Sequence, residues 1–321
     1  MDKIRAGVIG CGGMGTHHVK TLSEHESFDL IAGCDINPEA LKNLPNGVPG
    51  YASAEEMLAK HKLDLVSIIV PNHLYEPMVK LASAHGASVF CEKPFGHNLA
   101  SCRAMIAALQ AANQRGWVGG QRKYLRQFRA ARDIVAGQTL DFVNVLFTYW
   151  WGPAYGAIGW RGERAKSGGV AVIDSGWHVL DTLSWLVGDP TSVFAQLTYL
   201  PGRPDIDDKA AVQLRYPSGA IGSVVISYTM PKSVLDMAFV AGRRSYYLGY
   251  DGLVGFEDGR EILRVAKEEG DASFPAMYGE LAAAYRGAPS PYLTDMLRAE
   301  RIMQVVAACY ESDRTGRTVR V

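Results

Sequence analysis

A lysine at the end of an apolar run is the first residue of this chain that could take part in chemistry. Lys93 follows "VFCE" (89–92) and precedes Pro94, which has no N–H to continue the pairing of a strand. Proline favours an extended backbone at the residue before it and permits a cis peptide bond. An ammonium held at a strand end can stabilise negative charge on a substrate oxygen. An ordinary exposed lysine is the alternative, and the motif alone leaves both interpretations open.

A second set of reactive groups lies in "GGVAVIDSGWHVLDTLSWLVGDP" (168–190). Asp174, His178 and Asp181 stand at i, i+4 and i+7, so they share one face of a helix. They can form a buried structural pair, or two ligands of a metal for which no third ligand stands at useful spacing. They can also take a proton from a substrate hydroxyl near neutral pH. The residues alone leave these interpretations open, and we expect no metal.

The third group is the glycine loop "VIGCGGMG" (8–15). Gly10, Gly12 and Gly15 have the G-x-G-x-x-G spacing, which lets a backbone approach a pyrophosphate and aims a helix N-terminus at it. Asp35 ends the second apolar run, where a carboxylate accepts hydrogen bonds from the adenosine ribose hydroxyls. It would repel a 2′-phosphate, and the next four residues include no arginine to neutralise one. We therefore predict NAD as the cofactor, with NADP less favoured.

These groups need elements to position them, and the first 120 residues alternate between two periods. Short β-branched or apolar runs suit buried parallel strands, at 4–10, 28–35, 64–70 and 87–92. Helical stretches separate these runs. Ser53 with Glu56 forms a capping box, and Gly86 ends a helix over about 74–85. Alternation of this kind predicts a Rossmann doubly wound parallel sheet.

The second half of the chain has a different pattern. Helices are predicted near 124–137, 173–187, 275–286 and 291–311. Apolar runs between Gly and Pro turns predict antiparallel strands, at 141–150, 192–200, 210–216, 220–229 and 234–242. We therefore divide this α/β chain into a Rossmann domain, residues 1–121, and an α+β domain, residues 122–321.

The composition is that of a globular protein whose charges balance. Of 321 residues, 48% are hydrophobic and 21% charged, with 33 Lys+Arg against 33 Asp+Glu. This balance gives no general attraction to nucleic acid or to a membrane surface. The first apolar run is too short for a signal peptide, and no run is long enough to span a bilayer. Five cysteines without metal-type spacing are best explained as reduced thiols in the cytoplasm.

The motifs stand in a defined order, as "GVIGCGGMG" (7–15), "PNHLYEP" (71–77), "CEKPFG" (91–96) and the segment 168–190. In this combination the chain resembles, over essentially its whole length, the glucose–fructose oxidoreductase / inositol dehydrogenase / MocA (Gfo/Idh/MocA) family of NAD(P)-dependent sugar and polyol dehydrogenases. The resemblance implies that Lys93, Asp174 and His178 form the catalytic group. It also implies a second domain built on a mostly antiparallel open sheet, which binds substrate and often joins two or four subunits.

The resemblance further assigns the binding sites, since Pro71, Asn72 and Glu92 match positions that line the nicotinamide half of the cofactor site. The expected cofactor residues are Gly10, Gly12, Gly13, Met14, Gly15, Asp35, Ile36, Pro71, Asn72, His73, Glu92, Lys93 and Gln121. The expected substrate residues are Lys93, Lys123, Trp160, Arg161, Asp174 and His178. Two positions depart from the family pattern: Tyr75 replaces a common histidine, and Lys123 replaces a common arginine and so loses the bidentate fork.

Oxidation of a carbinol requires that its hydroxyl lose a proton while the carbon loses a hydride. His178 is the expected proton acceptor, Asp174 would orient it, and Lys93 would stabilise charge on the oxygen. Ligands bind at the carboxyl ends of strands in a doubly wound sheet, so we expect Lys93 to face the crevice between the domains. Either Lys93 or His178 can be the base.

Aromatic and cationic side chains gather in "YWWGPAYGAIGWRGERAKSGGV" (149–170), namely Trp150, Trp151, Tyr155, Trp160, Arg161, Arg164 and Lys166. Such groups suit the faces and hydroxyls of a sugar or cyclic polyol, and packing at a sheet edge or subunit interface is the alternative. We therefore expect an enzyme that oxidises a ring hydroxyl of a sugar, sugar derivative or inositol-like polyol with NAD. The alternatives are a hydrolase or lyase that uses bound NAD transiently, an NADP-dependent sugar reductase and a non-catalytic NAD-binding regulator.

Overall fold

A computed structural model describes residues 2–150, 158–270 and 272–321. The chain divides into two compact units. Unit 1 comprises Met1–Gln121 and Ala272–Glu300, and unit 2 comprises Arg122–Asp271 and Arg301–Val321. The expected division after residue 121 therefore omits a return of the chain, because residues 272–300 belong to unit 1.

Unit 1 is built on a seven-stranded sheet in the order β15-β6-β5-β4-β1-β2-β3. Its strands are β1 (Ile4–Ile9), β2 (Phe28–Cys34), β3 (Gly50–Tyr51), β4 (Leu65–Ile68), β5 (Ser88–Cys91), β6 (Gly116–Val118) and β15 (Thr294–Asp295). All neighbours pair in parallel except β15, which runs antiparallel to β6. The strand order reverses between β1 and β4, which is the switch point of a Rossmann sheet. The predicted doubly wound sheet is confirmed.

Helices connect these strands as the alternating sequence pattern predicts. They are α1 (Gly15–Glu24), α2 (Pro38–Leu41), α3 (Ala54–Lys60), η1 (Asn72–Leu74), α4 (Tyr75–Ala84) and α5 (Leu99–Ala111), with α9 (Ser273–Tyr285) from the returning segment. Ser53 caps α3 by accepting a hydrogen bond from the backbone N–H of Glu56, while the Glu56 carboxylate pairs with Lys60. Helix α9 packs on α1, and this contact explains why the return belongs to unit 1.

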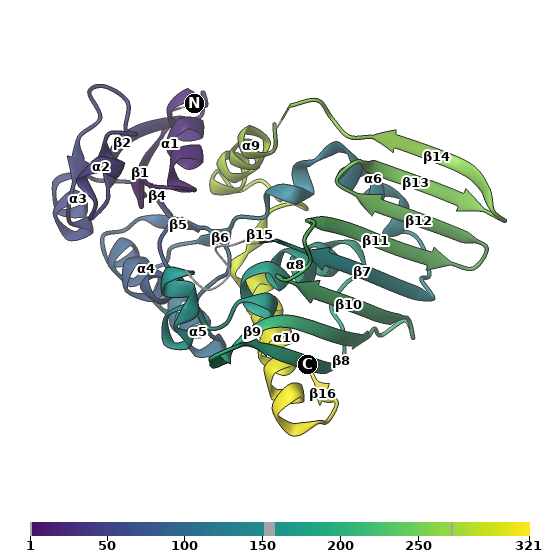
Figure 1. The fold of residues 1–321 in the computed structure, drawn as a ribbon. Coiled ribbons are helices and arrows are strands. Elements are labelled where there is room, and N and C mark those ends of the chain that lie inside the picture. The colour runs from purple at the N-terminus through teal and green to yellow at the C-terminus, as the bar shows by residue number, and fades with distance from the viewer. Residues whose placement is uncertain (1, 151–157, 271) are drawn as a thin grey trace. The chain divides into compact units, whose positions relative to one another are not determined.

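Unit 2 is built on a nine-stranded sheet in the order β14-β13-β12-β11-β7-β10-β9-β8-β16. Its strands are β7 (Phe142–Thr148), β8 (Ser192–Leu200), β9 (Arg203–Arg215), β10 (Ile221–Ser227), β11 (Val234–Ala241), β12 (Arg244–Gly249), β13 (Gly252–Glu257), β14 (Arg260–Ala266) and β16 (Val319–Arg320). Among the described strand pairs of this sheet, only β7–β10 is parallel. Figure 1 shows this sheet open, with β14 at one edge. The predicted mostly antiparallel sheet is confirmed.

The helical elements of unit 2 cover one face of its sheet. They are η2 (Gln121–Tyr124), α6 (Arg126–Val135), η4 (Gly159–Gly162), α7 (Arg164–Ser167), η5 (Ala171–Ser175), α8 (Gly176–Leu186) and α10 (Met296–Thr315), of which η2 and α10 extend across the unit boundaries. Helix α6 packs on β12–β14, α8 on β7, and η5 on β9 and β10. The strands meet them with buried apolar side chains, among them Val145, Phe147, Ile226, Met237 and Phe239.

The opposite face of the unit 2 sheet, which we call the open face, carries apolar side chains that reach solvent. It includes Phe142, Leu146, Ala211, Ile221, Val225, Val234, Ala238, Tyr247 and Val254. The register places Val225 between Leu146 and Ala211 on neighbouring strands, while polar side chains, among them Asn144, Ser223 and Asp236, lie on the same face. No described helix is long and apolar enough to cross a membrane.

Candidate functional site

The glycine loop lies at the carboxyl end of β1, where close backbone contacts exclude side chains. Gly10 has a φ of +95°, and a Cβ there would lie 2.0 Å from the carbonyl oxygen of Ile69. A Cβ on Gly15 would lie 2.0 Å from the carbonyl oxygen of Gly10, so only glycine lets α1 begin this close to the strand. A Cβ on Gly12 would meet nothing nearer than 3.9 Å, and one on Gly13 nothing within 4 Å. This space fits the approach of a pyrophosphate to the start of α1.

Asp35 is oriented by backbone donors at the end of β2. Its Oδ2 accepts from the N–H of Cys11 at 2.8 Å, and its Oδ1 accepts from the N–H of Asn37 at 2.8 Å. Ile36 between them is 89% exposed. The carboxylate is therefore fixed beside the glycine loop, where the dinucleotide fingerprint needs an acceptor for ribose hydroxyls. The donor set and the open glycines both fit NAD.

The other expected cofactor residues follow strands of the same sheet. Pro71, Asn72 and His73 follow β4, Glu92 and Lys93 follow β5, and Gln121 follows β6. Because the carboxyl ends of parallel strands lie along one edge, the sheet gathers these residues with the glycine loop and Asp35. The Lys93–Pro94 peptide is cis, as the sequence permits.

Glu92 is part of a buried polar chain that the sequence did not reveal. Its Oε1 lies 3.1 Å from Nε2 of His18, whose Nδ1 lies 2.7 Å from the hydroxyl of Tyr278. Tyr278 in turn contacts the hydroxyl of Ser67 at 3.0 Å. Burial raises the pKa of Glu92, but the hydrogen bond and charge of His18, with the charge of Lys93, outweigh it and hold that pKa below its ordinary value. These contacts therefore keep Glu92 as a carboxylate beside Lys93. Its Oε2 accepts a hydrogen bond from the backbone N–H of Lys93 at 3.1 Å.

In unit 2, the predicted Asp174 and His178 lie on successive helical elements. Asp174 belongs to η5, a π-helical turn, and the half-buried His178 belongs to α8. Nε of Arg161 donates to Oδ2 of Asp174 at 2.9 Å, and its guanidinium lies 4.4 Å from the ring centroid of Trp160. Three of the expected substrate residues thus form one cluster, and π-turns are often found at functional sites.

A tyrosine missed in the sequence lies beside this cluster. Tyr228 follows β10, is 3% exposed, and accepts a hydrogen bond from Oγ of Ser175. Burial and the negative charge of Asp174 raise its pKa well above its ordinary value, so Tyr228 stays neutral. It can therefore donate a proton in a hydrogen bond, but it does not act as a base at neutral pH.

Lys123, an expected substrate residue, takes part in a buried ion pair. Its side chain is 1% exposed, and Nζ donates to Oδ1 of Asp181 at 2.9 Å. Asp181, the third residue of the predicted helix face, is 4% exposed in its side chain. Lys123 lies in η2, directly before α6, and Asp181 lies in α8, so the ion pair joins these two helices. Removal of either partner would leave an unpaired charge in the interior. This pair gives Lys123 a structural role, and its expected role in substrate binding stays a prediction.

The aromatic segment is only partly described. Trp151 and Tyr155 lie outside the described residues, while Trp150 is 51% exposed. Lys166 pairs with Glu163 at 2.7 Å, and Arg164 lies 3.5 Å from Asp207. Both cations therefore have carboxylate partners within unit 2. Among the described residues, no cluster of three or more His, Cys, Asp or Glu side chains is placed to hold a metal ion.

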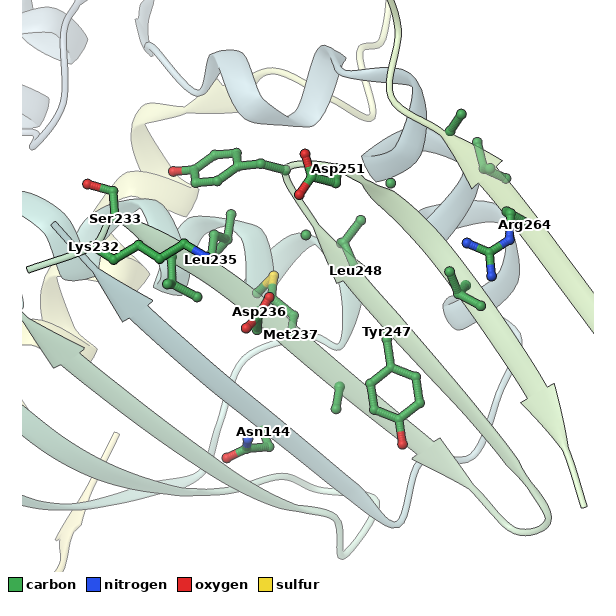
Figure 2. Close-up of a pocket in the computed structure, with 18 residues that line it drawn as sticks. Asn144, Lys232, Ser233, Leu235, Asp236, Met237, Tyr247, Leu248, Asp251 and Arg264 are labelled. Carbon is green, nitrogen blue, oxygen red and sulfur yellow. The ribbon is translucent and has the colours of Figure 1, made fainter. Parts of the chain in front are cut away.

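A hollow of about 620 Å³ lies on the open face over β11–β14. Figure 2 shows its lining, in which Asn144, Asp236 and Tyr247 rise from neighbouring strands. Lys232 and Ser233 stand at the end near the start of β11, and Arg264 at the β14 side. None of the expected catalytic residues lines this hollow.

Two sequence models of one family match the chain. The model described as an oxidoreductase family with an NAD-binding Rossmann fold matches residues 4–120, and the model of the GFO/IDH/MocA C-terminal domain matches residues 128–246. Together they span most of the chain, from the first strand of unit 1 to β12 of unit 2. The first segment of unit 1 is therefore an NAD-binding Rossmann domain.

Named relatives support the same grouping. D-apiose dehydrogenase of Paraburkholderia graminis is 25% identical over 348 aligned positions, which cover 100% of this chain and 90% of that protein. The rhizopine catabolism protein MocA of Rhizobium meliloti is 28% identical, over 60% of this chain and 60% of that protein. The chain thus spans less than two thirds of MocA.

A solved structure gives the corresponding similarity of fold. The WlbA dehydrogenase of Bordetella pertussis, crystallised with NADH and UDP-GlcNAcA, has a TM-score of 0.85 and 25% identity. The alignment covers 100% of this chain and 99% of that one.

Proposed function

The chain belongs to the GFO/IDH/MocA oxidoreductase family, and from that premise we propose that it is an NAD-dependent dehydrogenase of a sugar, sugar derivative or cyclic polyol. The observation that carries the proposal is the pairing of an oriented Asp35 with the glycine loop in unit 1, together with the match of both family models. The relatives named as D-apiose dehydrogenase and MocA support the substrate class.

We propose Lys93, Asp174 and His178 as the catalytic residues. NAD, when bound, supplies the acceptor for the hydride that leaves the carbinol carbon. His178 takes the hydroxyl proton, since imidazole titrates near neutral pH, and Lys93 stabilises the negative charge that develops on that oxygen. The reverse assignment, with Lys93 as the base, is the alternative, so both residues are candidates for that role. Arg161 donates to Oδ2 of Asp174 and so restricts the orientation of this carboxylate.

The preference for NAD over NADP rests on Asp35. A carboxylate held by two backbone donors can accept hydrogen bonds from ribose hydroxyls, and its negative charge repels a 2′-phosphate. Titration of the protein with each dinucleotide measures this preference. Comparable or tighter binding of NADP would contradict it.

The open face supports a further proposal, that the protein forms a homodimer or homotetramer through this sheet. Tyr247 is 51% exposed, and Val225 and Ile221 are each 40% exposed on the same face. A sheet face with several exposed apolar side chains is typical of an interaction surface.

The experiment that tests the activity is a substrate panel with NAD, followed at the absorbance of NADH. The panel contains inositols, aldoses, glycosides and uronates, and we expect turnover on at least one cyclic compound. Activity confined to acyclic or aromatic alcohols would contradict the proposal. Turnover without net NADH, by protein that retains its cofactor through purification, would instead favour the hydrolase or lyase alternative.

A further inference from the structure

Strand β9 carries two adjacent carboxylates that are both buried. Asp207 is 0% exposed and Asp208 is 1% exposed. The register of β9 against β8 shifts at these residues, and the two carboxylates meet different neighbours. Asp208 accepts from Oγ1 of Thr198 at 2.8 Å and from Nζ of Lys209 at 2.8 Å. Asp207 instead meets the start of the helix that carries Asp174 and His178.

The contacts of Asp207 are those of a helix cap supplied by another element. Its Oδ1 accepts from the N–H of Val170 at 2.9 Å, and its Oδ2 accepts from the N–H of Val172 at 2.8 Å. The hydroxyl of Tyr310, on α10, donates to Oδ1 at 3.1 Å, and Arg164 lies 3.5 Å away. Backbone N–H groups at a helix start have no partner within the helix, and a carboxylate there also complements the helix dipole.

The glycine before this cap is required by the approach of the carboxylate. Gly169 has a φ of +121°, and a Cβ there would lie 2.1 Å from the Tyr310 hydroxyl and 2.5 Å from Oδ1 of Asp207. Any other residue would therefore displace Asp207 or Tyr310 and would also strain the backbone. The segment from Gly169 to Val172 is built around this carboxylate.

Val170 links this cap to the expected catalytic residues, because both of its backbone polar groups are hydrogen-bonded. The N–H of Val170 is held by Asp207, while its carbonyl oxygen accepts from the N–H of Asp174 at 3.0 Å and from that of Ser175 at 3.3 Å. The second of these is the i→i−5 bond of the π-turn. The position of the Asp174 backbone is thus tied to Asp207 through Val170.

We propose that Asp207 is a positioning residue that fixes the π-turn and thereby the orientation of Asp174 and His178. The expected effect on kcat rests on the proposed function, whereas the expected effect on the backbone of the π-turn does not. Burial raises the pKa of Asp207, while the N–H groups of Val172 and Val170 and the charge of Arg164 oppose that rise. Removal of this acceptor leaves two N–H groups at a buried helix start without their partner.

The test compares Asp207→Asn with Asp208→Asn, which removes a comparably buried charge whose hydrogen bonds go to Thr198 and Lys209 on the sheet. We expect Asp207→Asn to increase amide hydrogen exchange selectively in residues 168–176. It should also lower kcat by about tenfold or more while the KM for NAD stays within about twofold, because a small misplacement of catalytic groups costs rate. Asp208→Asn should leave exchange in this segment and kcat near wild type, even if its Tm falls equally.

Equal exchange and equal kcat in the two variants would overturn the proposal. If Asp207→Asn does not fold, Tyr310→Phe removes one donor to the same oxygen, and selective exchange in 168–176 supports the anchor whereas unchanged exchange there refutes it. A wild-type protein that is inactive on every compound of the panel contradicts the proposed function instead. The exchange measurement still decides the role of Asp207 in that case.

Discussion

At the scale of single residues, Lys93 and Asp174 each make a contact with a neighbour that the sequence did not reveal. Glu92 lies beside Lys93 and is fixed by His18, and Asp174 is fixed by Arg161. Such neighbours restrict the orientation of a reactive group before substrate arrives, which is the main contribution of a preorganised site.

Replacement of the ammonium or the imidazole tests the proposed roles. Lys93→Met and His178→Ala should each lower kcat by roughly 10²-fold or more, because each removes a group that moves a proton or stabilises charge. The Kd for NAD, measured by titration, should stay close to wild type. Lys80→Met, at an exposed lysine paired with Glu76, is the control and should keep normal turnover. Near-normal turnover in either of the first two variants would refute the role of that residue.

The buried Glu92 predicts a pH dependence of stability. Its pKa is lowered on folding, so the ionised form adds stability above its unfolded value of 4.5, and this stability is lost as the pH falls through the folded pKa. Glu92→Gln should therefore reduce the free energy of unfolding at pH 7, and the difference from wild type should shrink below pH 4.5. Urea unfolding at several pH values measures this, with the exposed Glu56→Gln as control. A difference that grows in acid would contradict the account.

At the scale of elements, the turn between β1 and α1 contains glycines with different roles. Gly10 is required by the fold, whereas Gly13 leaves space for a ligand. Gly10→Ala should destabilise the protein by about 1–3 kcal/mol, since φ is +95° and the new Cβ would meet backbone. Gly13→Ala meets nothing within 4 Å, so the fold should persist while NAD binds more weakly. Thermal unfolding and NAD titration of both variants test this contrast, and equal destabilisation by both would contradict it.

Most elements near the proposed site could be predicted, because their signals are local. Strand β8 spans Ser192–Leu200 as predicted, and the strands of unit 1 follow from apolar runs bounded by turns. Strands β12–β14 were not predicted. In β14, for example, apolar and polar residues alternate only weakly, and most of its side chains are exposed. The role of Asp207 was also missed, because its partners are backbone N–H groups distant in sequence, which leave no side-chain pattern.

At the scale of the whole molecule, the chain returns to unit 1 after completing the sheet of unit 2. Periodicity predicts α9 but does not say on which sheet it packs, and the contact of Tyr278 with His18 and Ser67 settles this. The division into 1–121 and 122–321 was wrong in that respect, because a buried hydrogen-bonded tyrosine ties residues 272–300 to the first unit.

The open face predicts that the protein in solution contains more than one chain. Val225→Lys places a charge in the middle of this apolar face and should lower the mass measured by light scattering to that of one chain. Leu297→Lys, at a residue of unit 1 that is 54% exposed, is the control and should leave the mass unchanged. A monomeric wild type would contradict the proposed assembly.

The most direct test of the central claim follows the hydrogen itself. A substrate identified by the panel is labelled with deuterium at the carbon that is oxidised, and the NADH formed is analysed by mass spectrometry. The account predicts that the deuterium appears in NADH and that Lys93→Met and His178→Ala slow its transfer. Deuterium lost to water, or product formed without labelled NADH, would contradict direct hydride transfer.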